Sequence, residues 1–559
     1  MKKPVSIQTS SSFFPRFIED GSYYVDKTLL IQDIVENNRQ VALYTRPRRF
    51  GKSLNQTMLQ AFFDLQTAEQ YKHLFDGLAI AKNRELCEKH QGKYPVIALS
   101  FSGCTRQEFD DNCQSITWQI RSAMTPFASI IHDYQKTDFP DSEFLRGFLY
   151  AEIPALTNMK ILRQLSEFLH KYYGRPCILL LDEYDVPLQS AFLSGYYEKM
   201  VDVIRPLMTA ALKDNPHIQW AILTGCLRIA KESIFTGLNN PYVNTVLTRD
   251  PSAERFGFTQ AEVDALLDAA RLGEHRELVK KWYDGYLFGT KEVYNPFSVV
   301  NYVSYTLDAG EAMPKAYWAN TSGNDIIRNL LMLSDHDETR ERLQTLIDGG
   351  VITLPITENT VYHEMENNPD TLWSTMLFTG YLKPASPVPP NSRFVPMMLP
   401  NYEVRDLIEN TILTWLERDF RPHATPLMEA LLKGDATAAQ KQLNLHLQET
   451  ISCRDFLEYY YHGFLTGLLA AVRGQYRTIS NYEAGDGYPD IQVGTLDNSI
   501  CAILEVKQTT DEAKIQEQLA LAEEQFRTRR YERARLRYDT IIGYAVVFCR
   551  KSCVLRCIQ

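Results

Sequence analysis

The sequence lacks the features that mark membrane, secreted and repeat proteins. None of its apolar runs is long enough to cross a bilayer. The start Met1-Lys2-Lys3-Pro4-Val5-Ser6 leads into Ser and Phe rather than the apolar core of a signal peptide. Internal repeats and low-complexity tracts are also missing. We therefore expect no membrane partner and a cytoplasmic location.

Cysteine pairs with metal-ligand or redox spacing are missing as well. The ten cysteines are scattered, several of them inside predicted strands, which is typical of reduced thiols in a cytoplasm. Cys549, Cys553 and Cys557 are spaced by four, but no histidine or CxxC pair accompanies them. This pattern favours two strands around residues 550–552 over a zinc site.

An overall positive charge is also absent, because 59 Lys and Arg residues face 69 Asp and Glu residues and give a net charge of −10. A uniformly basic, nucleic-acid-coated surface is therefore not expected, although local charge matters more than the total. One local cluster lies near the C-terminus and comprises Arg527, Arg529, Arg530, Arg533, Arg535 and Arg537. It has two interpretations, a strip that follows a phosphate backbone or a solvated helix face.

The segment from Asp490 to Lys507 contains the residues of a metal-dependent nuclease site. Two apolar runs, 488–493 and 500–507, flank a turn-like Leu496-Asp497-Asn498-Ser499 and predict a β-hairpin. Glu505 and Lys507 are two apart on one strand and share a face, and the neighbouring strand can bring Asp490 to the same place. Two carboxylates suit Mg²⁺, and a lysine beside them can orient or deprotonate a water.

Nearby residues can complete this site. Glu483 precedes a flexible pair of glycines and is a candidate further ligand, and Gln525 lies on a predicted helix that packs on the sheet. The alternative is a solvated strand with alternating charges, which often produces Glu-x-Lys. Leu504 and Val506 flank Glu505 with apolar residues, which favours a central strand that carries charge into a cleft.

A phosphate-binding loop is predicted near the N-terminus, between a strand at 40–45 and a helix that opens at residue 54. The candidate nucleotide-binding residues of this segment are Arg46, Pro47, Arg48, Arg49, Phe50, Gly51, Lys52, Ser53 and Leu54. Backbone N–H groups at the helix start would cradle phosphates. Lys52 would meet the β- and γ-phosphates, and the Ser53 hydroxyl would bind Mg²⁺. Arg46 stands where the general pattern has glycine.

Two further strands end in residues that such a loop requires. An apolar run at 177–181 predicts a strand buried in a parallel sheet, and it ends in Asp182 and Glu183. Asp182 would hold the Mg²⁺ shell, and Glu183 would polarise an attacking water. The strand 219–225 brings Thr224 as a γ-phosphate sensor, followed by Arg228. Each of these segments, taken alone, could also belong to an ordinary α/β sheet with acidic strand ends. The order in which the loop and the two strands follow one another favours the nucleotide site.

Longer sequence motifs resemble those of one family of AAA-ATPase-like proteins, which usually carry a C-terminal PD-(D/E)xK nuclease domain. These motifs include Tyr24-Val25-Asp26-Lys27-Thr28, residues 46–53, Leu181-Asp182-Glu183-Tyr184-Asp185, Trp282-Tyr283-Asp284-Gly285-Tyr286, Tyr294-Asn295-Pro296-Phe297, Leu399-Pro400-Asn401-Tyr402, Pro489-Asp490 and Glu505-Val506-Lys507. In that family the loop form with Arg46 is normal. The chain differs from the family pattern at Cys226-Leu227.

The resemblance implies an α/β fold in three parts. They are an AAA-like P-loop ATPase domain with a parallel sheet at 1–255, a mainly helical lid or winged-helix-like region at 256–405, and an α/β PD-(D/E)xK nuclease-like domain at 406–559. In the middle part, Thr259 is a predicted helix N-cap, and the aromatic motifs at 282–286 and 294–297 either line a ligand or serve packing. The composition of the whole chain, 45% hydrophobic and 23% charged, is that of a globular protein.

Two functions follow from the resemblance. The first is an ATPase with Mg²⁺ at Ser53 and Asp182, joined to a nuclease with Mg²⁺ or Mn²⁺ at Asp490 and Glu505 that cleaves nucleic acid, DNA in the first instance. The alternative is a nucleotide-dependent switch or interaction protein whose nuclease-like domain is silent. ATP would act by moving the nuclease domain or by controlling a homo-oligomer, and the sequence favours neither.

Overall fold

The computed structural model describes most of the chain in two compact units. The described residues are 5–133, 142–151, 158–229, 241–318, 342–343, 345–358, 369–389, 392–450, 461, 465, 476–480, 491–528, 537–550 and 552–558. The N-terminal unit comprises residues 1–335 and 345–406, and the C-terminal unit comprises residues 336–344 and 407–559. Each unit is considered by itself.

A five-stranded parallel sheet forms the centre of the N-terminal unit. Its strands, in spatial order, are β2 (Val96–Ser100), β3 (Cys177–Asp182), β4 (Ile218–Gly225), β1 (Val41–Thr45) and β5 (Tyr242–Asn244). The predicted strands at 40–45, 177–181 and 219–225 are therefore confirmed. Because β4 lies between β1 and β3, its C-terminal end separates the phosphate-binding loop from the acidic end of β3.

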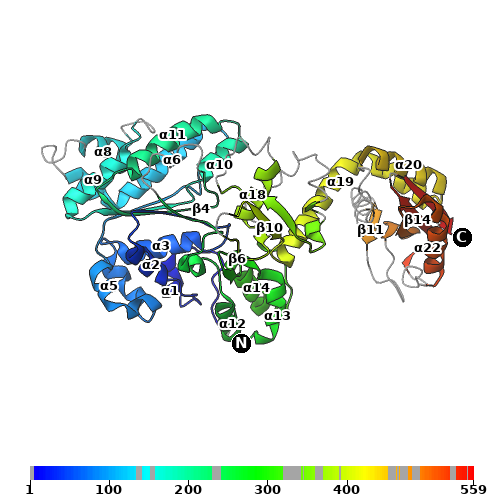
Figure 1. The fold of residues 1–559 in the computed structure, drawn as a ribbon, viewed down its shortest axis with the longest axis horizontal. Helices are drawn as coiled ribbons and strands as arrows, with labels where there is room; N and C mark the ends of the chain where they lie inside the picture. Colours follow the sequence, from blue (N-terminus) through cyan, green and yellow to red (C-terminus); the bar gives the residue numbers. More distant parts are fainter. Residues whose placement is uncertain are drawn as a thin grey trace. The chain divides into compact units, whose positions relative to one another are not determined.

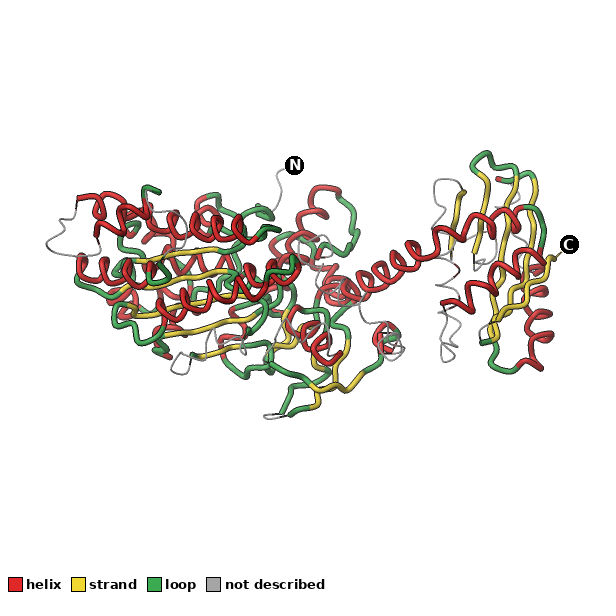
Figure 2. The backbone as a smooth tube through the Cα atoms, turned by 90° about the horizontal axis from the view of Figure 1, so that it is seen from above, coloured by secondary structure: helices red, strands yellow, loops and turns green. Residues whose placement is uncertain are grey.

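Helices cover both faces of this sheet, which explains why its strands are apolar on both sides (Figures 1 and 2). All six residues of β3 are buried. One face carries α6 (Phe109–Met124), α8 (Ser142–Leu149), α9 (Ile161–Tyr173), α10 (Val186–Leu193) and α11 (Tyr197–Leu212). The other carries α1 (Phe14–Glu19), α2 (Leu29–Asn37), α3 (Lys52–Phe63) and α5 (Arg84–His90), and the short α4 (Ala68–Tyr71) and α7 (Ala128–Asp133) connect larger elements.

The middle region belongs to the same compact unit and is mainly helical. Its elements are α12 (Gln260–Ala269), α13 (Arg276–Tyr283), the hairpin β6 (Tyr286–Phe288) and β7 (Lys291–Val293), α14 (Pro296–Ala309), α18 (Pro369–Thr379), and a sheet of β8 (Ile352–Pro355), β10 (Phe394–Met398) and β9 (Lys383–Pro384). The predicted N-cap at Thr259 is confirmed, because its side chain and that of Glu262 form a capping box at the start of α12.

The C-terminal unit contains a second, mixed five-stranded sheet. Its order is β11 (Tyr476–Ser480), β12 (Ile491–Thr495), β13 (Ile500–Gln508), β14 (Thr540–Cys549) and β15 (Ser552–Ile558), with only β13 and β14 parallel. One face packs with α20 (Ala436–Thr450) and the end of α19 (Tyr402–Leu432), and the other packs with α22 (Ile515–Thr528). The α/β fold class with a helical middle region is thus confirmed.

Two hairpins in this sheet agree with the sequence. Strands β12 and β13 are antiparallel and joined by a turn at 496–499, as predicted for the nuclease motif. Strands β14 and β15 pair from Cys549 and Ser552 outward, so the two-strand interpretation of the cysteine-rich end is confirmed. Burial raises the pKa of Cys549, Cys553 and Cys557, as expected for packed thiols.

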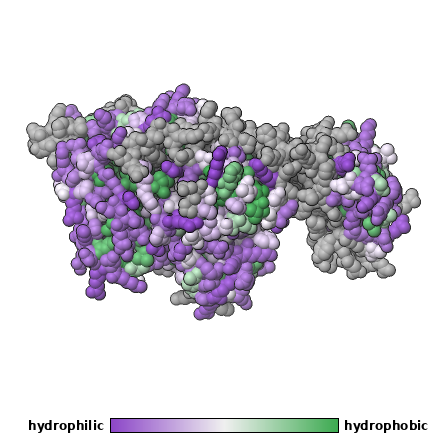
Figure 3. Space-filling model, in the orientation of Figure 1, coloured by the Kyte–Doolittle hydropathy of each residue, from purple (hydrophilic) through white to green (hydrophobic). Residues whose placement is uncertain are grey.

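The surface that faces the viewer in Figure 3 is largely hydrophilic, with small hydrophobic patches. Among the large apolar side chains that are exposed are Trp118 and Phe394, which lie far apart in the sequence. In the part of the chain that the structure describes, no helix combines the length and the apolar composition needed to span a bilayer.

A buried carboxylate joins two helices of the N-terminal unit. Glu403, in the first turn of α19, accepts hydrogen bonds from the Ser298 hydroxyl of α14 at 2.8 and 2.7 Å and from the Trp318 backbone N–H at 2.9 Å. Its side chain is fully buried, and burial raises its pKa to about 7 despite these donors. The start of α19 is therefore fixed to α14 by a group that titrates near neutrality.

Replacement of Glu403 by Gln should make stability less dependent on pH. The pKa of Glu403 is higher in the folded state, from 4.5 to about 7, so its stabilising contribution is present at low pH and is lost as pH rises through about 7. The full change corresponds to about 3 kcal/mol. Thermal unfolding from about pH 4 to about pH 8, which spans both pKa values, should show a smaller decline in Glu403→Gln than in the wild type. Equal declines in both proteins would contradict the assignment.

Candidate functional site

The phosphate-binding loop connects β1 to α3 in a conformation that its glycine permits. Gly51, the residue before α3, has φ of 78°, and Arg49 has φ of 69°. Both lie in the left-handed region, which costs a glycine little. The turn directs the backbone N–H groups at the start of α3 toward the space above the loop, which is the arrangement that binds anions at a helix N-terminus.

Arg46 holds this loop from below. Its side chain is fully buried, and its guanidinium donates to the Thr45 carbonyl at 2.8 Å, the Asn244 carbonyl at 2.9 Å and the Asn244 side chain at 2.7 Å. It also lies 5.1 Å from the ring centres of Phe256 and Phe288. Burial lowers its pKa to about 10. Arg46, a candidate nucleotide-binding residue, thus supports the loop from below and is not among the residues that line the cavity over it.

Lys52 and Ser53, the first residues of α3, face the acidic end of β3. The Lys52 ammonium donates to the carbonyls of Arg46 and Pro47 at 3.0 Å each. The Ser53 hydroxyl donates to Asp182 at 2.5 Å, and the other oxygen of that carboxylate accepts from the Thr224 hydroxyl at 2.6 Å. The structure therefore brings together Lys52, Ser53, Asp182 and Thr224, which the sequence assigned to one site.

Thr224 is buried and does not face the cavity. Its hydroxyl also accepts from the Gln56 amide at 3.1 Å. The position of Thr224 between the loop and β3 follows from the insertion of β4 between β1 and β3. In this geometry Thr224 is connected to the predicted phosphate site only indirectly, through its hydrogen bond to Asp182. Arg228, the other sensor candidate, forms a 3.9 Å ion pair with Glu358 at the surface.

Glu183 stands beside the loop lysine in a conformation that is rare for its residue type. It has φ of 52° and lies directly after β3. Burial raises its pKa, and nearby Lys52 and Arg48 oppose that shift. A residue held in an unfavourable backbone region next to a reactive group is often a functional one. A carboxyl with a raised pKa is suited to accept a proton from water.

The segment after β4 is fixed by the residues that follow Glu183. Asp185 accepts hydrogen bonds from the backbone N–H groups of Cys226 and Leu227 at 2.9 and 3.0 Å, and the Tyr184 hydroxyl donates to the Leu227 carbonyl at 2.6 Å. The Cys226 sulfur lies 3.6 Å from the Lys52 ammonium. Of the two residues that differ from the family pattern, Cys226 thus contacts the loop lysine, and Leu227 is held by Tyr184 and Asp185.

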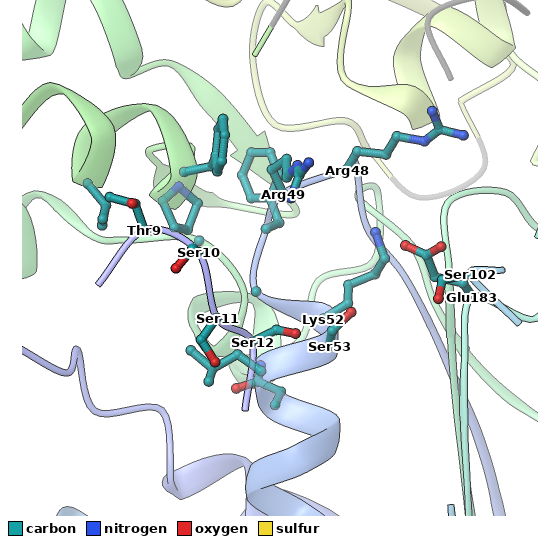
Figure 4. A pocket seen from close by; sticks show the side chains of 18 of the residues that line it. Thr9, Ser10, Ser11, Ser12, Arg48, Arg49, Lys52, Ser53, Ser102 and Glu183 are labelled. Carbon is teal, nitrogen blue, oxygen red and sulfur yellow. The ribbon is translucent and has the colours of Figure 1, made fainter. Parts of the chain in front are cut away.

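A cavity of about 790 Å³ lies over the loop (Figure 4). Its walls come from the N-terminal segment, the loop, the end of β3 with α10, and α14 of the middle region. The side chains that line it include Thr9, Ser10, Ser11, Ser12, Arg48, Arg49, Lys52, Ser53, Ser102, Glu183, Gln189, Phe258, Phe297 and Val300. The polar end holds Lys52, Arg48 and Glu183, and the opposite end is partly apolar. This shape and lining suit an amphiphilic ligand such as a nucleotide.

Sequence reasoning missed one wall of the cavity and left another open between lining a ligand and packing. The segment Ile7–Ser12 lies across the loop from α10, held by bonds from the Thr57 hydroxyl to the Ser12 carbonyl at 2.7 Å and from the Tyr23 N–H to the Ser6 carbonyl at 2.9 Å. Its only sequence signal is the run of hydroxyl residues at 9–12. The other wall contains Phe297, whose ring lies 4.6 Å from the Arg49 guanidinium. Of the aromatic motifs, that at 294–297 lines the cavity.

In the C-terminal unit, Glu505 and Lys507 lie on one face of the central strand β13. They alternate with Leu504 and Val506, which belong to the core on the other face. Their partners on β14 are Ala545 and Val547, which pack against α22. Gln525 is carried by α22, so three of the expected residues come from this strand and the helix that covers its face. Glu505 is fully buried, and Lys507 is partly exposed.

The remaining nuclease candidates lie outside the described residues. These are Asp490 and Glu483, and of the basic cluster only Arg527 and Arg537 are described, both exposed. The described part of β12 starts at Ile491, whose partner is Leu504, the residue before Glu505. Within the described residues, no group of three His, Cys, Asp or Glu side chains is arranged to hold a metal ion.

Comparison with known proteins agrees with this division of the chain. Residues 4–235 match the family described as "Predicted AAA-ATPase", and residues 456–557 match the "PD-(D/E)XK nuclease superfamily". An "Uncharacterized protein in vnfD 5'region" from Azotobacter chroococcum mcd 1 is 28% identical over 304 residues, which are 54% of this chain and 51% of that protein. The chain thus spans about half the length of that curated relative. No solved structure matches the sequence.

Both matched segments coincide with described features. The first contains the loop, Asp182 and Glu183, and the second contains the hairpin with Glu505 and Lys507. The chain therefore combines a domain of the predicted AAA-ATPase family with a C-terminal domain of the PD-(D/E)XK nuclease superfamily.

Proposed function

We propose that the N-terminal unit binds and hydrolyses ATP. The carrying observation is the cavity over the loop, in which the N-terminus of α3, Lys52 and Glu183 meet. A triphosphate would lie across the start of α3, with its γ-phosphate toward Glu183. The Lys52 ammonium would exchange its two neutral backbone carbonyls for charged phosphate oxygens, which gives it stronger hydrogen bonds.

The residues at the polar end fit a magnesium ion. The Ser53 hydroxyl and the Asp182 carboxylate, 2.5 Å apart, are oxygen donors of the type that Mg²⁺ takes in nucleotide sites. When bound, Mg²⁺ would neutralise charge on the phosphates. Thr224 would keep Asp182 oriented, and Glu183 would accept a proton from the attacking water. Arg48 and Arg49 line the cavity and are further cations for the phosphates, and Arg228 is proposed as a sensor although it pairs with Glu358 here.

We also propose that the C-terminal unit cleaves phosphodiester bonds in nucleic acid with Mg²⁺ or Mn²⁺, and that its substrate is DNA. Continuation of the β12–β13 register by one residue would pair Asp490 with Glu505. Those two carboxylates would hold the metal, and Lys507 would position the attacking water. Glu483 and Gln525 are proposed further members of this site. A cytoplasmic setting fits the nine described cysteines, none of which forms a disulfide.

Lys52→Ala should weaken ATP binding by more than about tenfold, because the ammonium is the side-chain cation at the start of α3. Binding of a fluorescent ATP analogue to the full chain measures this change. Lys82→Ala, which removes an exposed lysine of the same unit, serves as the matched control and should bind like the wild type. If Lys52→Ala also binds like the wild type, the cavity is not the nucleotide site.

Lys507→Ala and Asp490→Ala should each lower nucleic-acid cleavage by about a hundredfold or more, because each removes a group that prepares the attacking water. Single- and double-stranded DNA and RNA are incubated with the full chain, Mg²⁺ or Mn²⁺, and with or without ATP. The exposed Lys514 on the same unit provides the control variant Lys514→Ala. Equal cleavage by all four proteins, or none by the wild type, would favour the nucleotide-dependent switch with a silent nuclease-like domain.

A further inference from the structure

The three arginines of the phosphate-binding loop occupy different environments. Arg46 is buried below the loop, as described above. Arg49 is exposed, and its guanidinium lies against the Phe297 ring at the apolar part of the cavity. Arg48 lies between these extremes, partly buried, and lines the cavity at its polar end. Their neighbours in space, and not their neighbours in sequence, therefore distinguish the three side chains.

Arg48 extends from the loop to the element that follows Glu183. Its guanidinium donates to the Gln189 side chain at 3.0 Å, and Gln189 lies on α10, which starts three residues after Glu183. Asp185 and Glu183 both interact electrostatically with Arg48, and Arg48 in turn opposes the rise in the pKa of Glu183. Figure 4 shows Arg48, Lys52 and Glu183 on the side of the cavity away from Thr9 and Ser10. Arg48 thus belongs to the end where a γ-phosphate would meet water.

We propose that Arg48 is a catalytic residue that stabilises the γ-phosphate during hydrolysis from within the same chain. This inference rests on the proposed ATPase function and adds the source of the positive charge. Phosphoryl transfer gathers negative charge on the transferred group and on the bridging oxygen, and an arginine that meets this charge accelerates the reaction by about 10³- to 10⁵-fold. Such an arginine is supplied by the same chain in some enzymes and by a partner in others.

The reaction step balances with the groups at this end of the cavity. The water oxygen forms a bond to the γ-phosphorus while the bond from that phosphorus to the β,γ-bridging oxygen breaks. The electron pair of the broken bond remains on the β-phosphate of ADP, and a water proton passes to Glu183. Arg48 leaves Gln189 and donates to the oxygens of the transferred phosphate. Gln189 is a neutral acceptor, so its exchange for a phosphate oxygen strengthens that one hydrogen bond, while Cys226, Asp185 and Glu183 also interact with Arg48 at this end.

An arginine from the same chain also agrees with the charge balance of the site. Asp182, Glu183 and Asp185 would bring up to three negative charges close to a triphosphate. Lys52 and the proposed Mg²⁺ would offset part of this charge, and Arg48 adds a further cation that approaches from the loop side. A long, planar guanidinium that reaches α10 can contact the transferred phosphate while Lys52 remains on the β- and γ-phosphates. ATP hydrolysis then requires no arginine from a second copy.

The first test compares full-length variants at saturating ATP and Mg²⁺. Arg48→Ala should lower kcat by about a thousandfold or more, while its affinity for an ATP analogue stays within about tenfold of the wild type. It should also lose the tight binding of ADP with aluminium fluoride, which mimics the transferred phosphate. Arg48→Lys should recover only part of kcat, because lysine lacks the planar pair of donors. Arg39→Ala, an exposed arginine before β1, should match the wild type in all three measurements.

The second test distinguishes a same-chain arginine from a partner's. Arg48→Ala is mixed with an excess of Lys52→Ala, which retains Arg48 but should not bind ATP. Activity should remain at the level of Arg48→Ala alone, and the wild-type kcat should not change with protein concentration. Recovery of activity in the mixture would overturn the same-chain assignment. Unchanged kcat in Arg48→Ala, or an equal loss of ATP affinity and kcat, would overturn the catalytic role while the ATPase proposal stands. A wild type that binds ATP but never hydrolyses it would instead overturn both.

Discussion

The loop between β1 and α3 depends on one buried cation below it. Arg46 occupies the first position of the phosphate-binding loop, where a glycine is the common residue, and it is fully enclosed. Removing a guanidinium from water is costly, which its lowered pKa reflects. Three hydrogen bonds and two aromatic faces offset that cost. The same contacts connect the loop to β5 through Asn244 and to the middle region through Phe288, so the loop is braced by segments distant in sequence.

The cavity above the loop connects the ATPase core to the helical middle region. Phe297 lines the cavity and carries Arg49 on its ring, and the next residue, Ser298, donates to Glu403 at the start of α19. Phe297 and Ser298 are adjacent in the first turn of α14, so the cavity wall and the contact with Glu403 belong to the same helix turn. Because Glu403 is buried with its pKa near 7, its charge state and the packing of α14 depend on each other.

Local patterns determine the strands, the hairpins and the cap at Thr259, because each depends on residues close together in sequence. They also place Lys52, Ser53, Asp182 and Thr224 together, since the carboxyl ends of parallel strands share one edge. The supporting role of Arg46 depends on Asn244, 198 residues away, and the contact of Asp185 with Cys226 spans 41 residues. The wall formed by residues 7–12 likewise has no periodic pattern. Tertiary packing selects such partners, and sequence spacing does not encode them.

The second sheet shows how a strand can carry both a core and a reactive face. Leu504 and Val506 point into the packed core with α20, while Glu505 and Lys507 occupy the α22 side of the same strand. A fully buried carboxylate on a central strand is a poor choice for stability, since an apolar side chain of similar size would avoid its desolvation. The small Ala545 beside it leaves the position less crowded than a larger residue would. The nuclease role proposed for Glu505 would account for a buried carboxyl that packing alone does not favour.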